Sequence, residues 1–412
     1  MKHKYDIICI GLGISGLYFG YKTIGTDKKI LFIEKSDRVG GRIQSVKLDK
    51  SKYYAEGCAT RYFVNNNKPS LQNDGYVIKL LEDLDITSTS LSNNLTKSST
   101  NYVDVINKII TEYPGLKDEY AKYSFPNIVQ NLGYSIDSFC DGAGYPVFKE
   151  PMNLNIALYA LEKFSNDTQH VINGGYEHVC DKLYSIINKY HRFKFNKLVY
   201  KICHRDGQYI VNDKFISKKI LFTGTTNQLL NISFDVPHLY KLKNDLINYY
   251  FNYRAIRMYV QVTSPWWSKS EISYRWNSGT ALNQISYYNS NTILIYSNMN
   301  SADILYNMIT DKYKHIDDFI KCSKLQMLTE YITKIMENIV GVNNINLDKI
   351  WYKYTTDAVQ FVKPVAYHYN KFIEDIQENN NFFMLSGDYT KNPGWVNSCL
   401  SIVEDKYRKI LK

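Results

Sequence analysis

The sequence predicts an α/β protein in which a discontinuous nucleotide-binding domain carries an inserted α+β domain. The segment DIICIGLGISGLYFG, residues 6–20, has the pattern of a buried strand, a glycine-rich turn and the start of a helix. The segment KKILFIE, residues 28–34, follows as a second buried strand and completes a strand–helix–strand unit of about 30 residues. A further glycine-containing segment, FFMLSGDYTKNPGW, lies near the other end of the chain, so we expect both ends to contribute to this domain.

The hydrophobic pattern defines the elements of the first unit. Residues 7–10 form a continuous apolar run, which is typical of a strand that is buried on both faces. Ser15 to Ile24 fit a helix, and Gly25 stands where many helices end on a glycine. A G-x-G-x-x-G turn between such a strand and helix is the Rossmann-like arrangement.

The rest of the chain predicts a mixture of helices and strands. We first expect a polar surface loop at 88–100, helices in 102–162, and a glycine turn and a helix in 171–187. Strands should follow in 195–224, around a turn at Asp206 and Gly207, and at 249–263 and 292–297. A helix at 318–340 should come next, and then a last strand, loop and helix after residue 380. With 412 residues, the chain is long enough for two domains. We assign 1–80, 170–235 and 345–412 to the nucleotide-binding domain, and 81–169 and 236–344 to a substrate-binding domain.

The composition excludes several classes of partner and site. The formal net charge is +10, but the lysines are scattered, which argues against a nucleic-acid partner. No stretch approaches the roughly 18 apolar residues of a membrane helix, and the first apolar stretch is too short for a signal peptide. The seven cysteines lie far apart, as expected of reduced thiols in a cytoplasmic protein. The histidines form no H-x-x-x-H pair, so we expect no metal site.

The glycine-rich turn predicts a dinucleotide site. Gly11 permits the tight bend, Gly13 lets backbone N–H groups approach a pyrophosphate, and Gly16 lets the helix pack closely on the strand. The N-terminus of the helix offers partial positive charge to the phosphates. Glu34 follows Gly16 by 18 residues, which is near the spacing of the acid that binds the ribose hydroxyls.

A second motif directly follows the second strand. In EKSDRVGGRIQS, residues 34–45, Gly40 and Gly41 lie between Arg38 and Arg42. Guanidinium groups beside small residues suit a diphosphate and a flat ring. The two motifs together closely resemble those of the flavin-dependent amine oxidase family, in which an acid followed by R-x-G-G-R comes after the dinucleotide turn. The resemblance implies a Rossmann-like domain that binds FAD rather than NAD.

Segments further along the chain resemble the same family. FFMLSGDYTKNPGWVNSCLS is similar to its C-terminal motif, where Gly387 and Asp388 would approach the phosphate and ribityl chain, and where Trp395 and Val396 would lie beside the flavin. VINGGYEHV resembles its central glycine pair, and Val199 matches the strand whose backbone contacts the adenine. No S-G-G-C-Y attachment segment is present, so we expect noncovalent FAD. The resemblance implies these cofactor-binding residues: Gly11, Gly13, Ile14, Ser15, Gly16, Glu34, Lys35, Arg38, Gly40, Gly41, Arg42, Ala59, Thr60, Arg61, Val199, Gly387, Asp388, Trp395 and Val396.

Two segments bear on the branch of the family. EGCATRYF resembles the E-L-G-A-M-R stretch of the L-amino-acid oxidases, in which Arg61 would bind the substrate carboxylate bidentately. PGWVNS is closer to the G-W-I-D-S form of that branch than to the tyrosine-containing form of the monoamine oxidases. A contact of Arg61 with an FAD phosphate or with an internal glutamate is the alternative.

The resemblance implies four residues at the substrate, namely Arg257, Trp395, Phe361 and Arg61. Trp395 would form one wall beside the flavin, and Phe361, placed by register from Trp351, would form the other; core packing is the alternative for both rings. Two such rings would hold a cationic amine by cation–π attraction. Arg257 stands where the family carries a lysine that is hydrogen-bonded through water to flavin N5, and a guanidinium cannot act as a neutral base.

These resemblances imply an FAD-dependent oxidoreductase that oxidises a small amine or an L-amino acid. A hydride would pass from the carbon that bears the amine to FAD and leave an imine, and molecular oxygen would reoxidise the flavin to give hydrogen peroxide. Polyamine oxidases, protoporphyrinogen oxidases and carotenoid desaturases share the two glycine motifs; an acidic pocket would favour polyamines, and a long apolar tunnel would favour desaturation. A third hypothesis, motivated by Arg257, is a flavin-binding protein without turnover.

Overall fold

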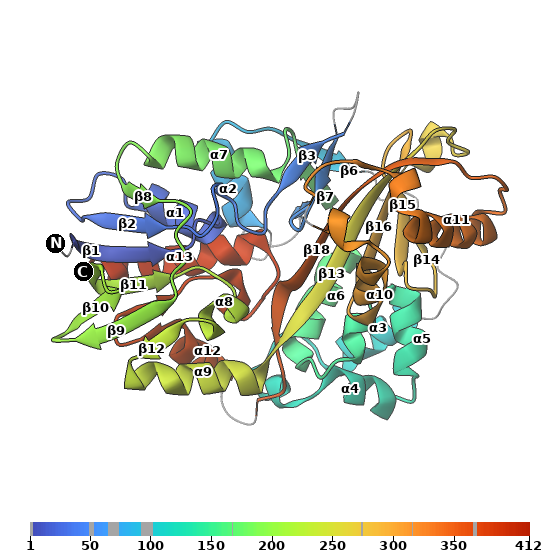
Figure 1. The fold of residues 1–412 in the computed structure, drawn as a ribbon. Coiled ribbons are helices and arrows are strands. Elements are labelled where there is room, and N and C mark those ends of the chain that lie inside the picture. The colour runs from blue at the N-terminus through green and yellow to red at the C-terminus, as the bar shows by residue number, and fades with distance from the viewer. Residues whose placement is uncertain are drawn as a thin grey trace.

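The computed structural model describes residues 3–48, 53–64, 74–91, 102–166, 168–272, 275–314, 316–365 and 369–412. These segments form two halves, each built on one large sheet (Figure 1). Both ends of the chain lie in the same half, on the side that faces away from the other half (Figure 1). Within the described ranges, no helix combines the length and the apolar character that crossing a membrane requires.

The first half is built on a nine-stranded sheet. Its parallel strands are β20 (Phe382–Met384), β11 (Phe215–Phe222), β1 (His3–Ile10), β2 (Ile30–Ile33) and β8 (Arg192–Lys194). The sheet is extended by β10 (Gln208–Val211), β9 (Lys201–Arg205), β12 (Ser233–Asp235) and β19 (Glu378–Asn379). Ile7 and Cys9 of β1 pack with α1 (Ile14–Lys22), α7 (Tyr176–Ile187) and α13 (Val396–Leu411), whereas Ile8 and Ile10 join the core on the opposite face. The alternation of β1 therefore fills two core layers.

The predicted first unit is confirmed, although β1 begins at His3, before the apolar run 7–10, and the helix ends two residues early. The expected strands are β1 and β2, and the helix between them is α1. The helix ends at Lys22 rather than Ile24, and Thr23 is its C-cap. The Thr23 hydroxyl donates to the carbonyls of Phe19 and Gly20 at 2.9 and 3.1 Å, in addition to the Thr23 backbone N–H.

The second half is built on a six-stranded antiparallel sheet. Its order is β14 (Arg275–Asn277), β15 (Gln284–Tyr287), β16 (Thr292–Asn298), β13 (Tyr250–Val262), β18 (Leu347–Val362) and β17 (Ile320–Lys321). One face, with Ile256 and Ile285, packs against α10 (Asn300–Asn307) and α11 (Gln326–Val340). The long strands β13 and β18 run side by side from the boundary between the halves into the second half (Figure 1).

Smaller elements complete the described structure. The helices expected in 102–162 are α3 (Tyr102–Glu112), α4 (Phe125–Asn131), α5 (Ile136–Ala143) and α6 (Leu154–Asn166). Two small sheets contain β3 (Ser45–Lys47) with β4 (Tyr54–Glu56), and β5 (Tyr62–Val64) with β7 (Thr168–Ile172) and β6 (Ser88–Leu91). The other helices described are α2 (Gly75–Asp83), α8 (Thr226–Leu230), α9 (Pro237–Tyr249) and α12 (Tyr369–Gln377).

Two expected elements are wrong in part. The expected loop at 88–100 begins as β6, because Ser88–Leu91 pairs with β7; residues 92–100 lie outside the described residues. The helix expected at 318–340 begins only at Gln326, because Ile320 and Lys321 pair with β18. The division into domains stays a prediction, and Leu347–Val362 belongs to the second sheet.

Candidate active site

A cavity of about 900 Å³ is lined by residues from both halves of the molecule. This volume is at the upper end of small-molecule sites, which are typically about 300–1,000 Å³. With one exception, Gly16, every cofactor-binding residue predicted from the sequence lines this cavity, and so do the four predicted substrate residues. The structure thus brings together residues that are far apart in the sequence, while their individual roles stay predictions.

The glycines of the first turn have different surroundings. Gly11 has a φ of +105°, which an L side chain rarely adopts. A Cβ at Gly16 would lie 2.4 Å from the carbonyl oxygen of Gly11, so Gly16 serves close packing inside the turn and not the cavity. Gly13 is the N-cap of α1, and a Cβ there would meet nothing within 4 Å. The N-terminus of α1 therefore faces open space in which an anionic group fits.

The second glycine pair packs directly on the first turn. The Gly40 N–H donates to the Leu12 carbonyl at 2.8 Å, and a Cβ at Gly41 would lie 3.3 Å from the Cα of Gly13. Arg38 donates to the carbonyls of Val39 and Ile43, both at 2.9 Å. Arg38 therefore fixes the conformation of its own loop, although it also lines the cavity.

Glu34 is held in place by backbone donors. Its Oε2 accepts from the Leu12 N–H at 2.8 Å, and its Oε1 accepts from the Ser36 N–H at 3.0 Å. The Ser36 hydroxyl also donates to Oε1, at 2.9 Å, so Oε2 of this buried carboxylate is the oxygen that can accept from a ribose hydroxyl with its second lone pair. Lys35 and Val199 line the same cavity. The expectation that Val199 lies in a strand is wrong, since β9 begins only at Lys201.

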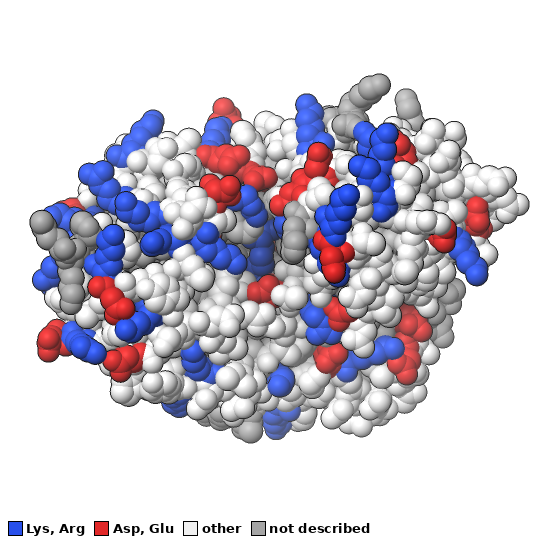
Figure 2. All heavy atoms as spheres, viewed as in Figure 1, with Lys and Arg blue, Asp and Glu red and all other residues white. Residues whose placement is uncertain are grey.

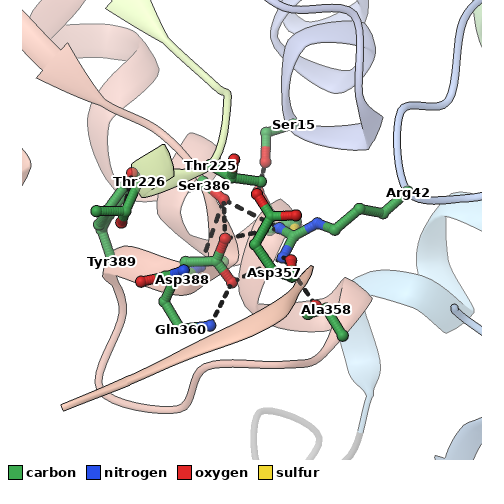
Figure 3. Close-up of polar contacts among 12 residues, drawn as sticks. Ser15, Arg42, Thr225, Thr226, Asp357, Ala358, Gln360, Ser386, Asp388 and Tyr389 are labelled. Carbon is green, nitrogen blue, oxygen red and sulfur yellow. Dashed lines mark hydrogen bonds and ion pairs between the residues drawn. The ribbon is translucent and has the colours of Figure 1, made fainter. Parts of the chain in front are cut away.

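Arg42 and Asp388 form the ion pair that joins the two ends of the chain at the cavity. Arg42 Nη2 lies 2.8 Å from Asp388 Oδ2, and the carboxylate is 1% exposed (Figure 3). Arg42 also donates to the carbonyl of Ala358 at 2.9 Å, while the Gln360 N–H and the Ser386 hydroxyl donate to Asp388. Burial opposes the charge of Arg42, but Asp388 outweighs burial and raises the pKa of this guanidinium. Arg42 therefore stays charged, with its N–H groups at the cavity wall.

The last helix begins at the cavity. Trp395 is the N-cap of α13, whose first turn contains no acidic residue, and both Trp395 and Val396 line the cavity. The positive end of the helix dipole therefore favours negative charge nearby. Gly394 has a φ of +94°, and a Cβ there would lie 3.2 Å from Val359 of β18. This close approach sets Trp395 beside the second sheet.

The two predicted aromatic walls both line the cavity and both pack on aromatic neighbours. The Trp395 ring contacts Phe63 edge-on, with ring centroids 5.2 Å apart. The Phe361 ring lies 5.7 Å from Phe251 and 5.5 Å from Tyr253. These contacts fix the orientation of each ring, and a role beside the flavin stays a prediction for both.

Two predicted arginines lie on different elements at the other end of the cavity. Arg257 on β13 donates to the carbonyl of Cys58, and its guanidinium lies 5.1 Å from the ring centre of Tyr296, its cross-strand neighbour on β16. Arg61, just before β5, donates to Gln169 Oε1 at 2.7 Å. The adjacent residues Ala59 and Thr60 also line the cavity.

A third arginine, Arg275, lines the cavity and was missed from the sequence. Burial lowers the pKa of Arg61, the positive charges of Arg275 and Arg257 act in the same direction, and Tyr145 opposes them. The carboxylates of the described residues that line the cavity are Glu34, Asp357 and Asp388. Polar and apolar residues alternate along β14 and β15, so the polar side chains share one face of the sheet. This period-two pattern is the sequence signal that could have identified Arg275.

The charge outside the cavity is mixed. On the face shown in Figure 2, Lys and Arg side chains are interspersed with Asp and Glu rather than gathered into one patch. The absence of a nucleic-acid partner stays a prediction. In the described segments, no three His, Cys, Asp or Glu side chains come together as a metal site would require.

Comparisons with known proteins bear on the fold. A family model described as an NAD(P)-binding Rossmann-like domain matches residues 9–78. Over 87 residues the chain is 36% identical to an uncharacterized protein of Acanthamoeba polyphaga mimivirus; the match covers 21% of this chain and only 16% of that relative. Three solved variants of putrescine oxidase, from a redesign of its cofactor binding, are also similar.

The structural likeness extends over the whole chain. One putrescine oxidase variant has a TM-score of 0.70 at 13% identity, covering 99% of both chains. The other two have TM-scores of 0.68 and 0.69 at 14% and 12% identity, again covering 99% of this chain. The predicted fold class is therefore confirmed: the chain has a mixed α/β fold that matches the fold of putrescine oxidase, and residues 9–78 match a Rossmann-like domain.

Proposed function

We propose that the chain binds FAD noncovalently and oxidises a carboxylate-bearing amine, of which an L-amino acid is the simplest example. The observation that carries this proposal is one cavity that has a glycine-lined, phosphate-compatible end and an arginine-rich end. The fold shared with putrescine oxidase supports a flavin amine-oxidase-like enzyme. It does not identify the substrate, because function depends on the site.

The residues at the first end fit FAD. The open space beside Gly13 and the N-terminus of α1 suit a pyrophosphate, and the fixed carboxylate of Glu34 suits a ribose. The cysteines that line the cavity are Cys58 and Cys399, and burial raises the pKa of both thiols. A protonated thiol is a poor nucleophile, so this environment supports noncovalent binding.

The charge of the second end supports an amino acid over a polyamine as substrate. Arg61, Arg257 and Arg275 all line it, and the side chains acting most strongly on the charge of Arg61 are two arginines and two tyrosines. A polyamine carries several positive charges and would be repelled there. A carboxylate would be attracted, and the guanidinium fork binds it bidentately. The site therefore favours an amino acid over a polyamine, despite the fold it shares with putrescine oxidase.

The predicted substrate residues have different roles in the proposed reaction. Arg61 would hold the substrate carboxylate, and Trp395 and Phe361 would enclose the amine. Arg257 is always charged, so it cannot accept the proton of the amine, and the substrate must react with its amine neutral. The N-terminus of α13 would favour the negative charge that develops during the reaction.

Held by residues such as Gly13 and Glu34, FAD would supply the redox chemistry, which is removal of a hydride from the carbon bearing the amine. The resulting imine would be hydrolysed to an oxo acid and ammonia, and oxygen would be the final electron acceptor, reduced to hydrogen peroxide. The protein contributes binding, orientation and electrostatics to this step.

Substitution of Arg61 tests the proposal. We expect Arg61→Gln to raise the KM for an L-amino acid at least about tenfold while FAD content stays unchanged, because a charge-assisted bond is lost. The matched control is Arg205→Gln, at an exposed position of β9. Nη2 of Arg205 lies 3.3 Å from Oδ2 of Asp235. Loss of FAD from the Arg61 variant, with KM unchanged in the remaining holoenzyme, would instead identify Arg61 as a cofactor contact.

A further inference from the structure

Arg275 lies on the cavity face of the six-stranded sheet, at its edge. Arg275 of β14 lies opposite Ser286 of β15 in the sheet. The same row continues across the sheet through Leu294 of β16 to Tyr259 of β13. Side chains alternate along a strand, so Arg257, two residues before Tyr259, shares this face with Arg275. Three strand spacings of about 4.8 Å and an offset of two residues along the strand, about 7 Å, separate the two arginines, so their backbones are about 16 Å apart.

Polar contacts beside Arg275 join the sheet to the end of α5. Gln284 on β15 donates through Nε2 to the carbonyls of Ala143 and Gly144, at 3.1 and 3.2 Å. Asn277, two residues after Arg275, donates to the carbonyl of Gly142. These bonds fix the end of α5 against the sheet and give the arginine a rigid surrounding.

Arg275 also differs from the other cavity arginines in its partners. Arg257 donates to the Cys58 carbonyl, and Arg61 donates to Gln169. The Nε of Arg275 is buried and has no hydrogen-bond partner among the described residues. A buried donor on a cation is costly without a partner, and an anion bound there would satisfy it.

We propose that Arg275 binds a second acid group of the substrate, and that the substrate is an amino dicarboxylate. This inference rests on the proposed function, in which Arg61 holds the carboxylate next to the amine. A neutral amino acid would leave the Arg275 Nε without a partner and would bring one negative charge to three guanidinium groups. A dicarboxylate brings two negative charges, and Arg61 and Arg275, which lie on separate elements, would each bind one of its carboxylates.

The test compares isosteric substrates under anaerobic conditions with the FAD-loaded protein. We expect L-glutamate to be at least about tenfold better than L-glutamine in the ratio of flavin reduction rate constant to Kd. Arg275→Gln should lower this ratio about 10- to 100-fold for glutamate and less than about threefold for glutamine. The control variant Arg205→Gln should leave both ratios unchanged, since that side chain is exposed and distant from the cavity.

Binding of glutarate provides a readout that does not depend on flavin chemistry. Glutarate should raise the Tm of the FAD-free wild type and of Arg205→Gln more than that of Arg275→Gln, because a ligand stabilises the state that binds it. Equal use of glutamate and glutamine, with Arg275→Gln behaving like the control, would overturn this inference and leave the proposed function intact. An Arg275-dependent glutarate shift without reduction by any amino acid would support the acid-binding site and overturn the proposed oxidation.

Discussion

At the scale of single residues, two glycines of one turn have separable roles. A Cβ at Gly13 meets open space, whereas a Cβ at Gly16 meets the Gly11 carbonyl at 2.4 Å. Gly13→Ala should therefore cost less than about 1 kcal/mol of stability but weaken FAD binding at least about tenfold by blocking the pyrophosphate. Gly16→Ala should cost about 1–3 kcal/mol through overpacking. Urea unfolding and FAD titration measure the two effects, and unimpaired FAD binding by Gly13→Ala would contradict the placement of the pyrophosphate.

Glu56 should make stability fall as pH rises. Burial raises its pKa to about 8, although Ser45 and the Tyr176 N–H donate to it. The folded state therefore keeps a proton that the unfolded chain releases near the ordinary value of 4.5. The stabilisation is complete below that lower value and is lost as pH rises through the upper one, at most about 1.4 kcal/mol per pH unit.

The variant Glu56→Gln tests this pH dependence. Its free energy of unfolding should decline less than that of the wild type between mildly acidic and mildly alkaline pH, because the amide does not titrate. Glu330→Gln, at an exposed position of α11, is the control and should follow the wild type. Parallel pH profiles for wild type and Glu56→Gln would show that Glu56 is ionised in the folded protein.

At the scale of elements, the strands of the second sheet separate core from cavity by alternation. Ile285 is fully buried against α10 and α11, whereas the next residue, Ser286, lines the cavity. Ile285→Ala should lower the free energy of unfolding by about 2–5 kcal/mol, and Ser286→Ala by less than about 1 kcal/mol. Denaturant titration of the two variants measures this. Equal losses would contradict the assigned faces.

The elements that the sequence predicts well are those whose pattern is local. β1 and β2 are continuous apolar runs, and α1 follows a glycine turn, so neighbours in the chain determine them. The start of α11 and the strand β6 depend on pairing with distant segments, β18 and β7. Such pairing partners are not visible in a local pattern, and both elements were predicted wrongly in part.

The candidate site divides in the same way. Its predicted cofactor end consists of contiguous motifs such as residues 34–45, which the resemblance to a family makes recognisable in the sequence. Its substrate end brings together Arg61, Arg257 and Arg275 from three separate segments. The sequence resemblance identified the first two, but Arg275 depends on the register of β14 with β15, which only the folded sheet provides.

At the scale of the whole molecule, thiol accessibility reports on the cavity. Five of the seven cysteines are buried, whereas Cys58 and Cys399 are partly exposed and line the cavity. A thiol reagent should therefore modify at most these two in the native FAD-free protein, slowly because burial raises their pKa. Saturation with FAD should slow the modification further, and mass spectrometry of labelled peptides identifies the sites. Labelling that FAD does not affect would place the cofactor elsewhere.

The central claim is that this cavity holds FAD and oxidises a carboxylate-bearing amine. The most direct test is the visible spectrum of the FAD-loaded protein without oxygen, recorded before and after addition of L-amino acids and, separately, of putrescine. The account predicts that amino acids, the acidic ones foremost, bleach the yellow flavin and that putrescine does not, because the arginines repel it. Bleaching by putrescine alone, or a protein that does not retain added FAD, would contradict it.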